Sequence, residues 1–518
     1  MGSAAENDLE RPTPPPAPLK GEDFRSEIEK SRPRHGAGGS FHCAGRPYAS
    51  GCSTGTNLMI RNLLVLLAFA AAPALAQELS PAHTARIDRL VGEALTSTGV
   101  PSASIAVVRD GRIVLARAYG RQSPDIATAT PDALYPIASI SKQFTAAAIL
   151  ILRDQGRLSL DDKVSRYLPG ITGGDRITIR QLLSHTSGLQ DYWPQDYSFA
   201  AMEHDVTPAQ IVDRWARKPL DFEPGTLWQY SNTGYVVAGM IVERVSGQSL
   251  LAFLQSHVFA PLGMHPIDQD LAVGPGFPVG YRRNALGPVR PERPAGRGWL
   301  YAAGELAMTA SDLARWDIAR MDRALLPARD WAEQETPIIL TNGVSSNYGL
   351  GVSLRDINGH HAVLHGGEAV GFLSTNIVFP HDREAIVVLV NAWFGNAHDQ
   401  IARGITDVLH PPAAGDEQAV AFARGIYDQL RAGRIDRSLL TEDANYYFTD
   451  QVLRDYGASL GPLGDPQTFA AAGPARLRGG FVNRNYTLSF PGRQLTIVTY
   501  AEPGERGKIE QFLVMPGG

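Results

Sequence analysis

The sequence predicts a mixed α/β (α+β) fold, in which an antiparallel sheet flanked by helices is built from the two ends of one large domain around an inserted all-helical region. Residues 102–108 and 112–119 have the composition of strands and surround Asp110-Gly111, a dipeptide that favours a tight hairpin turn. Four further strand patterns lie late in the domain, at 349–355, 361–365, 372–379 and 385–391. The sequence between them is mainly helical, so the early and late strands have to meet in one sheet.

We expect this domain to span residues 80–410. Its helices are predicted from their 3.6-residue hydrophobic periodicity. A helix over 80–98 precedes the hairpin, and another follows the last strand and ends at Leu409. The inserted region has helical patterns at 207–217, 235–246 and 311–320.

A smaller unit follows a break in the pattern. The proline-rich sequence after His410 predicts a linker at 411–416. Beyond it, a helix pattern at 417–432 precedes strand patterns at 481–490, 495–500 and 509–514. A helix followed by an antiparallel meander predicts an α+β accessory domain over 417–518.

The first 76 residues differ in composition from the rest of the chain. Residues 1–58 are rich in proline, glycine and charge, so we interpret them as a disordered, non-native extension upstream of a true start at Met59. Residues 59–76 have the order of a signal peptide and end in an Ala-x-Ala cleavage site at Ala76. The alternative, a membrane anchor, has an apolar run shorter than the ~20 residues of a spanning helix. We therefore expect a periplasmic or secreted protein without a stable membrane span after cleavage.

Charge argues against a nucleic-acid partner. The formal net charge is −5, and the arginines are scattered along the chain rather than clustered. We expect the partner to be a small-molecule or peptide substrate.

Lysine is scarce in this chain, and Lys142 stands in an unusual place. The sequence has six lysines against 42 arginines, yet Lys142 begins an apolar helix pattern that follows Pro136 and ends at Gly156. An amine can lose its proton where a guanidinium cannot, and burial favours its neutral, basic form. Ser139 lies three residues earlier, on the same helix face. The pair predicts a serine nucleophile with a lysine base.

The Ser-x-x-Lys spacing alone is weak, because it arises by chance in many chains. A structural lysine in this helix would need a buried carboxylate partner, and none lies within a helical turn of it. Two further segments carry polar groups after turns or strands, namely Tyr230-Ser231-Asn232 and His365-Gly366-Gly367. Taken singly, the first is an ordinary turn tripeptide and His365 a packed histidine at a strand end.

Together with 182–189 (LLSHTSGL) and 302–306 (AAGEL), these segments resemble the penicillin-recognising serine hydrolases, in the branch of class C β-lactamases, D-aminopeptidases and family VIII-type esterases. The resemblance covers about residues 80–410. It implies a β-lactamase/transpeptidase-like fold and an acyl-enzyme mechanism without a cofactor.

The same resemblance implies roles for individual residues. Ser139 would be the acylated nucleophile and Lys142 its proton partner, with Tyr230 sharing the acid and base work because the nearby ammonium raises its acidity. Asn232 would hold the amide or acyl side chain of the substrate. The backbone N–H groups of Ser139 and Glu368 would form the oxyanion hole.

One segment departs from the family pattern. Where β-lactamases and many D,D-peptidases have Lys-Thr-Gly or a close variant, this chain has His365-Gly366-Gly367. An imidazole is mostly neutral at pH 7 and binds a substrate carboxylate weakly, whereas an ammonium binds it well. This favours esters, amides or short D-amino-acid peptides as substrates. The alternative is a penicillin-binding or sensor protein, or a weak β-lactamase with little turnover.

No metal site is expected. His360, His361 and His365 could indicate one, but no carboxylate lies at ligand spacing within that strand, which favours surface or structural histidines. The loops 190–202 and 266–298 should form the walls of the substrate pocket. Their aromatic residues predict an apolar cleft: Tyr192, Trp193, Tyr197, Phe277, Tyr281 and, just beyond, Trp299.

Overall fold

The computed structural model describes residues 78–193, 198–411, 414–473, 475–504 and 507–517. The predicted extension at 1–58, the predicted signal segment at 59–76 and Tyr197 lie outside these ranges, as do residues 412–413 of the predicted linker. The predictions for these segments therefore stay predictions.

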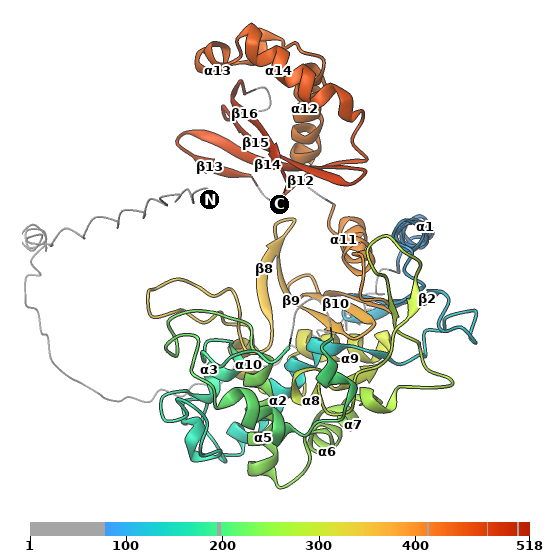
Figure 1. Ribbon diagram of the computed structural model, residues 1–518, viewed down its shortest axis with the longest axis vertical. Helices are drawn as coiled ribbons and strands as arrows, with labels where there is room; N and C mark the ends of the chain where they lie inside the picture. The colour runs from blue at the N-terminus through green and yellow to red at the C-terminus, as the bar shows by residue number, and fades with distance from the viewer. Residues whose placement is uncertain (1–77, 194–197, 412–413, 474, 505–506, 518) are drawn as a thin grey trace, which may run out of the picture. The chain divides into compact units, whose positions relative to one another are not determined.

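The main sheet has six antiparallel strands in the order β2-β1-β11-β10-β9-β8 (Figure 1). β1 pairs with β11, with Ala103 opposite Val390, so the two ends of the domain meet as predicted. The turn between β1 and β2 has positive φ at Asp110 (51°) and Gly111 (70°), which fits the predicted tight hairpin. The strands are β1 Ser102–Arg109, β2 Arg112–Gly120, β8 Ser353–Ile357, β9 His360–Ala369, β10 Phe372–Phe379 and β11 Glu384–Val390. The predicted antiparallel sheet is confirmed, although β8 begins four residues later than expected.

Helices cover both faces of this sheet, which explains why its central strands β1 and β11 are buried along almost their whole length. On one face α1 (Pro81–Thr98) packs against α11 (Ala397–Leu409). Ile105 of β1 belongs to the core under these two helices, whereas its neighbour Ala106 belongs to the core of the helical region on the other face. Because successive side chains of a strand point to opposite faces, a strand covered on both sides buries nearly all of its side chains.

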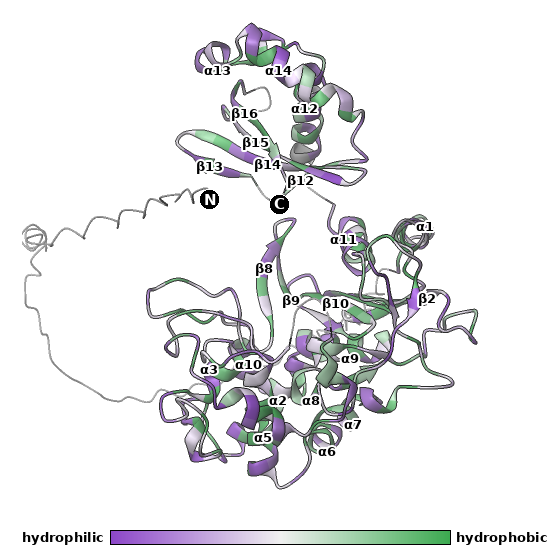
Figure 2. Ribbon diagram, viewed as in Figure 1, coloured by the Kyte–Doolittle hydropathy of each residue, from purple (hydrophilic) through white to green (hydrophobic). Residues whose placement is uncertain are grey.

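The helical region surrounds α2 (Lys142–Asp154), whose buried residues include the whole stretch from Lys142 to Leu150. In Figure 2 hydrophobic (green) and hydrophilic (purple) residues are mixed along the helices of this region. α2 contacts α5 (Asn232–Ser246) and α8 (Tyr301–Gly304), and α9 (Ala310–Met321) contacts β1 and β11. The other helices here are α3 Ile179–Leu183, α4 Pro208–Ile211, α6 Leu250–Leu254, α7 Ala260–Leu262 and α10 Ala328–Gln334, and the short strands are β3 Tyr135–Pro136, β4 Ile267–Asp268, β5 Tyr281–Arg282, β6 Arg290–Pro291 and β7 Leu306–Met308.

Two predicted helices differ from the observed ones. The helix expected at 207–217 is α-helical only in α4 and continues as a π-helix over Val212–Ala216. α5 begins three residues before its predicted start, because the Ser231 side chain caps it by accepting a hydrogen bond from Gly234 N. Within the described ranges no single helix is long and apolar enough to cross a membrane. Only the bent pair Asn232–Ser246 and Leu250–Leu262, at 70° to each other, reaches that length and composition together.

The C-terminal part has its own sheet and its own core, which includes Tyr427, Phe448 and Ile497. The strand order is β12-β14-β15-β16, and β13 pairs with β14. The predicted meander is confirmed, whereas α13, α14, β12 and β13 are not predicted by the sequence pattern. The elements are α12 Ala414–Arg431, α13 Glu442–Tyr447, α14 Asp450–Leu460, β12 Thr468–Ala471, β13 Arg476–Arg478, β14 Phe481–Phe490, β15 Arg493–Ala501 and β16 Ile509–Pro516. α12 thus begins inside the predicted linker, which ends at residue 416.

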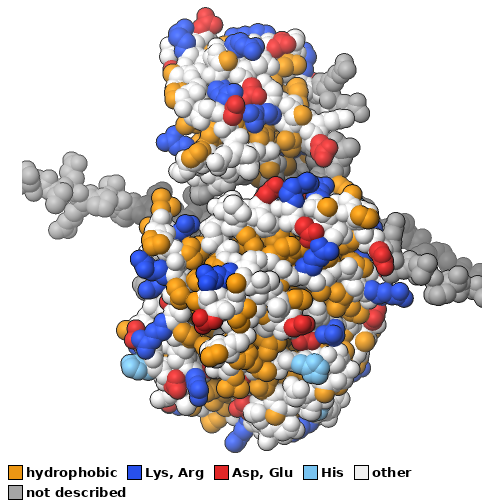
Figure 3. All heavy atoms as spheres, turned by 90° about the vertical axis from the view of Figure 1, so that its right-hand side faces the viewer, with side chains coloured by type: hydrophobic (Ala, Val, Ile, Leu, Met, Phe, Trp, Pro, Cys, Tyr) orange, Lys and Arg blue, Asp and Glu red, His pale blue; other side chains and the backbone are white. Residues whose placement is uncertain are grey.

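On the face of the molecule shown in Figure 3, positively and negatively charged side chains are interspersed.

Candidate active site

Ser139 lies in a tight turn that two strands hold in place. The turn is a 3-10 helix, Ala138–Ser141, between β3 and α2. Ile137, just before it, donates its N–H to Leu306 O of β7 (2.9 Å) and accepts a hydrogen bond from Ser374 Oγ of β10 (2.9 Å). Ala138 has φ 50°, a left-handed conformation that is unfavourable for a residue with a side chain. The two hydrogen bonds hold the chain in this conformation directly before the serine.

Strand β9 packs closely against the same turn at Gly367. A Cβ atom on Gly367 would lie 2.2 Å from both Ile137 O and Ser374 Oγ, so no larger residue fits without movement. Glu368 follows at an exposed position of β9, opposite Leu373 of β10. The structure thus places Gly367 and Glu368 of β9 beside the turn that carries Ser139.

Lys142 is fully buried, and its amine is surrounded by oxygen atoms. Lys142 Nζ lies 3.0 Å from Ser139 Oγ, 2.7 Å from Asn232 Oδ1 and 2.7 Å from Ala303 O. A neutral amine has two N–H bonds and one lone pair. The two carbonyl oxygens can accept the N–H bonds, which leaves the lone pair for the hydroxyl proton of Ser139.

The charge of this amine is set by its surroundings. Burial lowers the pKa of Lys142 to about 7, and the negative charge of Asp191 opposes that change. Near neutral pH a large fraction of the amine is therefore unprotonated. This agrees with the expectation that burial favours the basic form.

Asn232 connects Asp191 to Lys142 through hydrogen bonds. Asp191 Oδ1 accepts the backbone N–H of Asn232 (3.0 Å), and Asp191 Oδ2 accepts the side-chain amide of Asn232 (3.1 Å). Burial raises the pKa of Asp191, and its hydrogen bonds and the charge of Lys142 lower it. Both ends of the Asn232 side chain are thus engaged within the protein, by Lys142 and by Asp191. Asp191 could not be predicted as a site residue, because its contact with Asn232 spans 41 residues of the chain and depends on the tertiary fold.

Tyr230 completes the group around Ser139. Its phenol interacts with the Ser139 side chain, and Lys142 Nζ lies 4.9 Å from the centre of its ring. Burial raises the pKa of Tyr230 well above the usual value, the interaction with Ser139 lowers it, and the charge of Asp191 raises it. The net direction is opposite to the predicted gain in acidity, because desolvation of the buried phenol is the largest effect. The phenol therefore carries its proton at neutral pH.

His365 is placed as a buried neutral imidazole. Its Nε2 lies 2.8 Å from Tyr348 Oη, and its Nδ1 lies 2.5 Å from Gly366 O. Burial, followed by the charge of Lys142, lowers the pKa of His365 to about 3. His185 packs against Tyr230 with ring centres 4.1 Å apart and accepts Ser231 N–H (3.1 Å), so it supports the turn. His365 thus supplies no positive charge near neutral pH.

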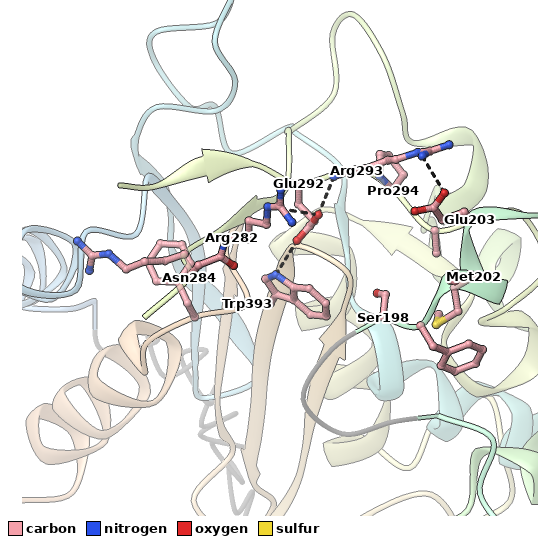
Figure 4. Close-up of a pocket in the computed structure, with 14 residues that line it drawn as sticks. Ser198, Met202, Glu203, Arg282, Asn284, Glu292, Arg293, Pro294 and Trp393 are labelled. Carbon is pink, nitrogen blue, oxygen red and sulfur yellow. Dashed lines mark hydrogen bonds and ion pairs between the residues drawn. The ribbon is translucent and has the colours of Figure 1, made fainter. Parts of the chain in front are cut away.

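A separate pocket of about 420 Å³ lies among Ser198, Arg282, Glu292, Arg293 and Trp393 (Figure 4). Trp393 Nε1 donates to Glu292 (3.1 Å), and Arg293 pairs with Glu203 (3.1 Å). Ser139, Lys142 and Tyr230 are not among its lining residues.

Two of the aromatic residues expected in the wall of the substrate cleft, Tyr192 and Trp299, are instead buried in a cluster with Trp215.

Comparison with known proteins assigns most of this chain to one family. The family model described as Beta-lactamase matches residues 87–409, more than half of the chain. The chain therefore belongs to the β-lactamase family. Among curated relatives, a D-aminopeptidase from Brucella anthropi is 31% identical over 330 residues, which cover 58% of this chain and 61% of that protein. The chain thus spans less than two thirds of that relative.

Solved structures share the fold. A D-stereospecific amidohydrolase from Streptomyces sp. is 29% identical, with a TM-score of 0.54, and the match covers 64% of this chain and 99% of that one. An octameric penicillin-binding protein homologue from Pyrococcus abyssi is 22% identical, with a TM-score of 0.57, and the match covers 83% of this chain and 95% of that one. The β-lactamase/transpeptidase-like fold that the resemblance implied is confirmed.

Proposed function

We propose that this protein is a serine hydrolase that forms an acyl-enzyme on Ser139 and releases it to water. The observation that carries the proposal is the buried Lys142 amine, 3.0 Å from Ser139 Oγ and with a pKa lowered to about 7. A base with a pKa near the working pH is suited to accept the hydroxyl proton.

In the acylation step, Ser139 Oγ would bond to the carbonyl carbon of the substrate while its proton passes to Lys142 Nζ. The negative charge would develop on the carbonyl oxygen, which we assign to the backbone N–H groups of Ser139 and Glu368. When the bond to the leaving group breaks, that group needs a proton. The protonated phenol of Tyr230 interacts with Ser139 and is suited to deliver one and to recover it from Lys142.

In the second step, water would attack the acyl carbon and Ser139 would leave as an alcohol. The same amine can take the water proton and return one to Ser139 Oγ, which restores the starting state. Asn232 would act by positioning Lys142 and not mainly by holding substrate, because both ends of its amide are already engaged.

For the substrate we propose esters, amides or short D-amino-acid peptides. The neutral His365 favours this class, because it offers no fixed cation for the carboxylate of a β-lactam. The similarity to a D-aminopeptidase and to a D-stereospecific amidohydrolase supports the same class.

We also keep as a proposal that the protein is exported after cleavage near Ala76.

The test uses a fluorescent serine-reactive phosphonate and three substrates: a p-nitrophenyl ester, a D-amino acid p-nitroanilide and nitrocefin. We expect labelling at Ser139, turnover of the ester or the anilide, and little hydrolysis of nitrocefin. Lys142→Ala should reduce turnover by about 10²–10⁴-fold. Lys163→Ala is the matched control, because Lys163 is exposed. Folded protein that is not labelled, or an adduct that persists for hours with no substrate turned over, would overturn the proposal.

A further inference from the structure

Two histidines and a carboxylate from three separate segments meet at one end of the main sheet. His360 is the first residue of β9, Asp382 lies in the turn between β10 and β11, and His410 directly follows α11. One ligand atom from each residue can be chosen so that all three lie within 4.8 Å of one another. These residue types are the ones that bind borderline divalent metals such as zinc.

The contacts within the cluster are short. His360 Nδ1 lies 3.0 Å from Asp382 Oδ2, and the rings of His360 and His410 are 4.0 Å apart between their centres. Zinc bonds of about 2.0–2.2 Å place two ligand atoms of one ion about 3.3 Å apart. Side-chain rotation can therefore bring the three ligand atoms to one ion without movement of the sheet.

A fourth residue, Glu384, contacts His410. His410 Nε2 lies 2.9 Å from Glu384 Oε2, and the two side chains are only 6% and 8% exposed. Neither atom makes a hydrogen bond of acceptable geometry within the described part of the chain. The other carboxylate oxygen, Glu384 Oε1, lies 3.2 Å from Arg109 Nε. A carboxylate held in this way against an imidazole is the usual arrangement that orients a metal-binding histidine.

The cluster is separate from the candidate active site. His360 and His365 are five residues apart on β9, which corresponds to about 16 Å along a strand. His361 cannot join His360 at one ion, because successive side chains of a strand point to opposite faces. The sequence of this one strand contains no carboxylate at ligand spacing, because Asp382 and His410 come from other segments that only the fold brings to His360.

We propose that His360, Asp382 and His410 bind one divalent transition-metal ion, zinc in the first place, with Glu384 orienting His410. The ion would join the start of β9, the β10–β11 turn and the end of α11. Such a site is structural in kind, because it fastens the last helix of the hydrolase fold to the sheet. The opposing interpretation is that the two neighbouring histidines and Asp382 form only a polar contact.

The experiment uses the full chain without an affinity tag, freed of metal by dialysis against a chelator. Zn²⁺ is titrated against a chromophoric indicator, and Co²⁺ is added separately to record its absorption spectrum. We expect one equivalent of zinc, a cobalt spectrum of a low-coordinate nitrogen and oxygen site, and a higher unfolding temperature with zinc than without it. None of these readouts depends on hydrolysis, so they are independent of the proposed function.

Variants locate the site. His360→Ala and His410→Ala should each weaken zinc binding by at least about 100-fold, and Glu384→Gln by about 10–100-fold. The His360 side chain is 37% exposed, so its removal should leave the fold intact even if a change at the buried His410 does not. His361→Ala is the matched control in the same strand and should bind zinc as the original protein does. No stoichiometric zinc binding, or unchanged affinity in folded His360→Ala, would refute the site.

Discussion

Replacing Gly367 with alanine would test whether the close packing of β9 against the Ser139 turn is needed for activity. The new Cβ would lie 2.2 Å from Ile137 O and from Ser374 Oγ. Ordinary contact between such atoms requires about 3.5 Å, so the turn and the strand have to separate by about 1 Å. Misplacement of a reacting group by about 1 Å can cost about 100-fold in rate. We expect kcat/KM for a p-nitrophenyl ester to fall by about 100-fold, and the free energy of unfolding by about 1–3 kcal/mol.

Gly366→Ala is the control for this prediction. A Cβ on Gly366 would have its nearest neighbour, Ser374 O, at 3.6 Å, which is ordinary contact. This variant should therefore keep kcat/KM within a factor of about 3. Initial rates and thermal unfolding of both variants separate loss of activity from loss of fold. Full activity in Gly367→Ala would refute the reasoning, and an equal loss in both variants would show that the contact is not the cause.

Three further predictions concern the proton-transfer groups. Because Lys142 has to be neutral to accept a proton and its pKa is lowered to about 7, kcat/KM should rise with pH through about 7 and then level off; a profile that is flat from pH 5 to 9 would contradict this. Asp191→Asn should move that midpoint to lower pH, because the Asp191 charge raises the pKa of Lys142; a shift to higher pH would show that the sign is wrong. Tyr230→Phe should lower kcat/KM by about 10²–10⁴-fold with an unchanged unfolding temperature, and a variant as active as the original would remove Tyr230 from the mechanism.

Local features of the site could be predicted from the sequence. Ser139 and Lys142 are three residues apart, and that separation places their side chains together in either a 3-10 turn or an α-helix. The hairpin at Asp110-Gly111 is local in the same way, since both residues tolerate positive φ. In each case the contact depends on neighbours in the chain and not on tertiary packing.

Features that depend on distant segments could not be predicted. Asp191 reaches Lys142 through Asn232, which is 41 residues further along the chain. The acidity of Tyr230 was predicted in the wrong direction, because the pattern shows the nearby lysine but not the loss of solvent around the phenol. α13 and α14 were missed because they are short and polar, and their stability depends on the C-terminal core.

The hydrogen bond from Ser374 to Ile137 joins residues 237 positions apart, and β1 pairs with β11 across almost the whole domain. During synthesis, the serine turn therefore leaves the ribosome long before the strands that fix it exist. Until β9, β10 and β11 are complete, one edge of β1 has no partner and the Ser139 hydroxyl lacks the contacts that surround it in the folded protein. We expect slow folding, and a nascent chain that cannot be acylated before nearly all of this domain has been made.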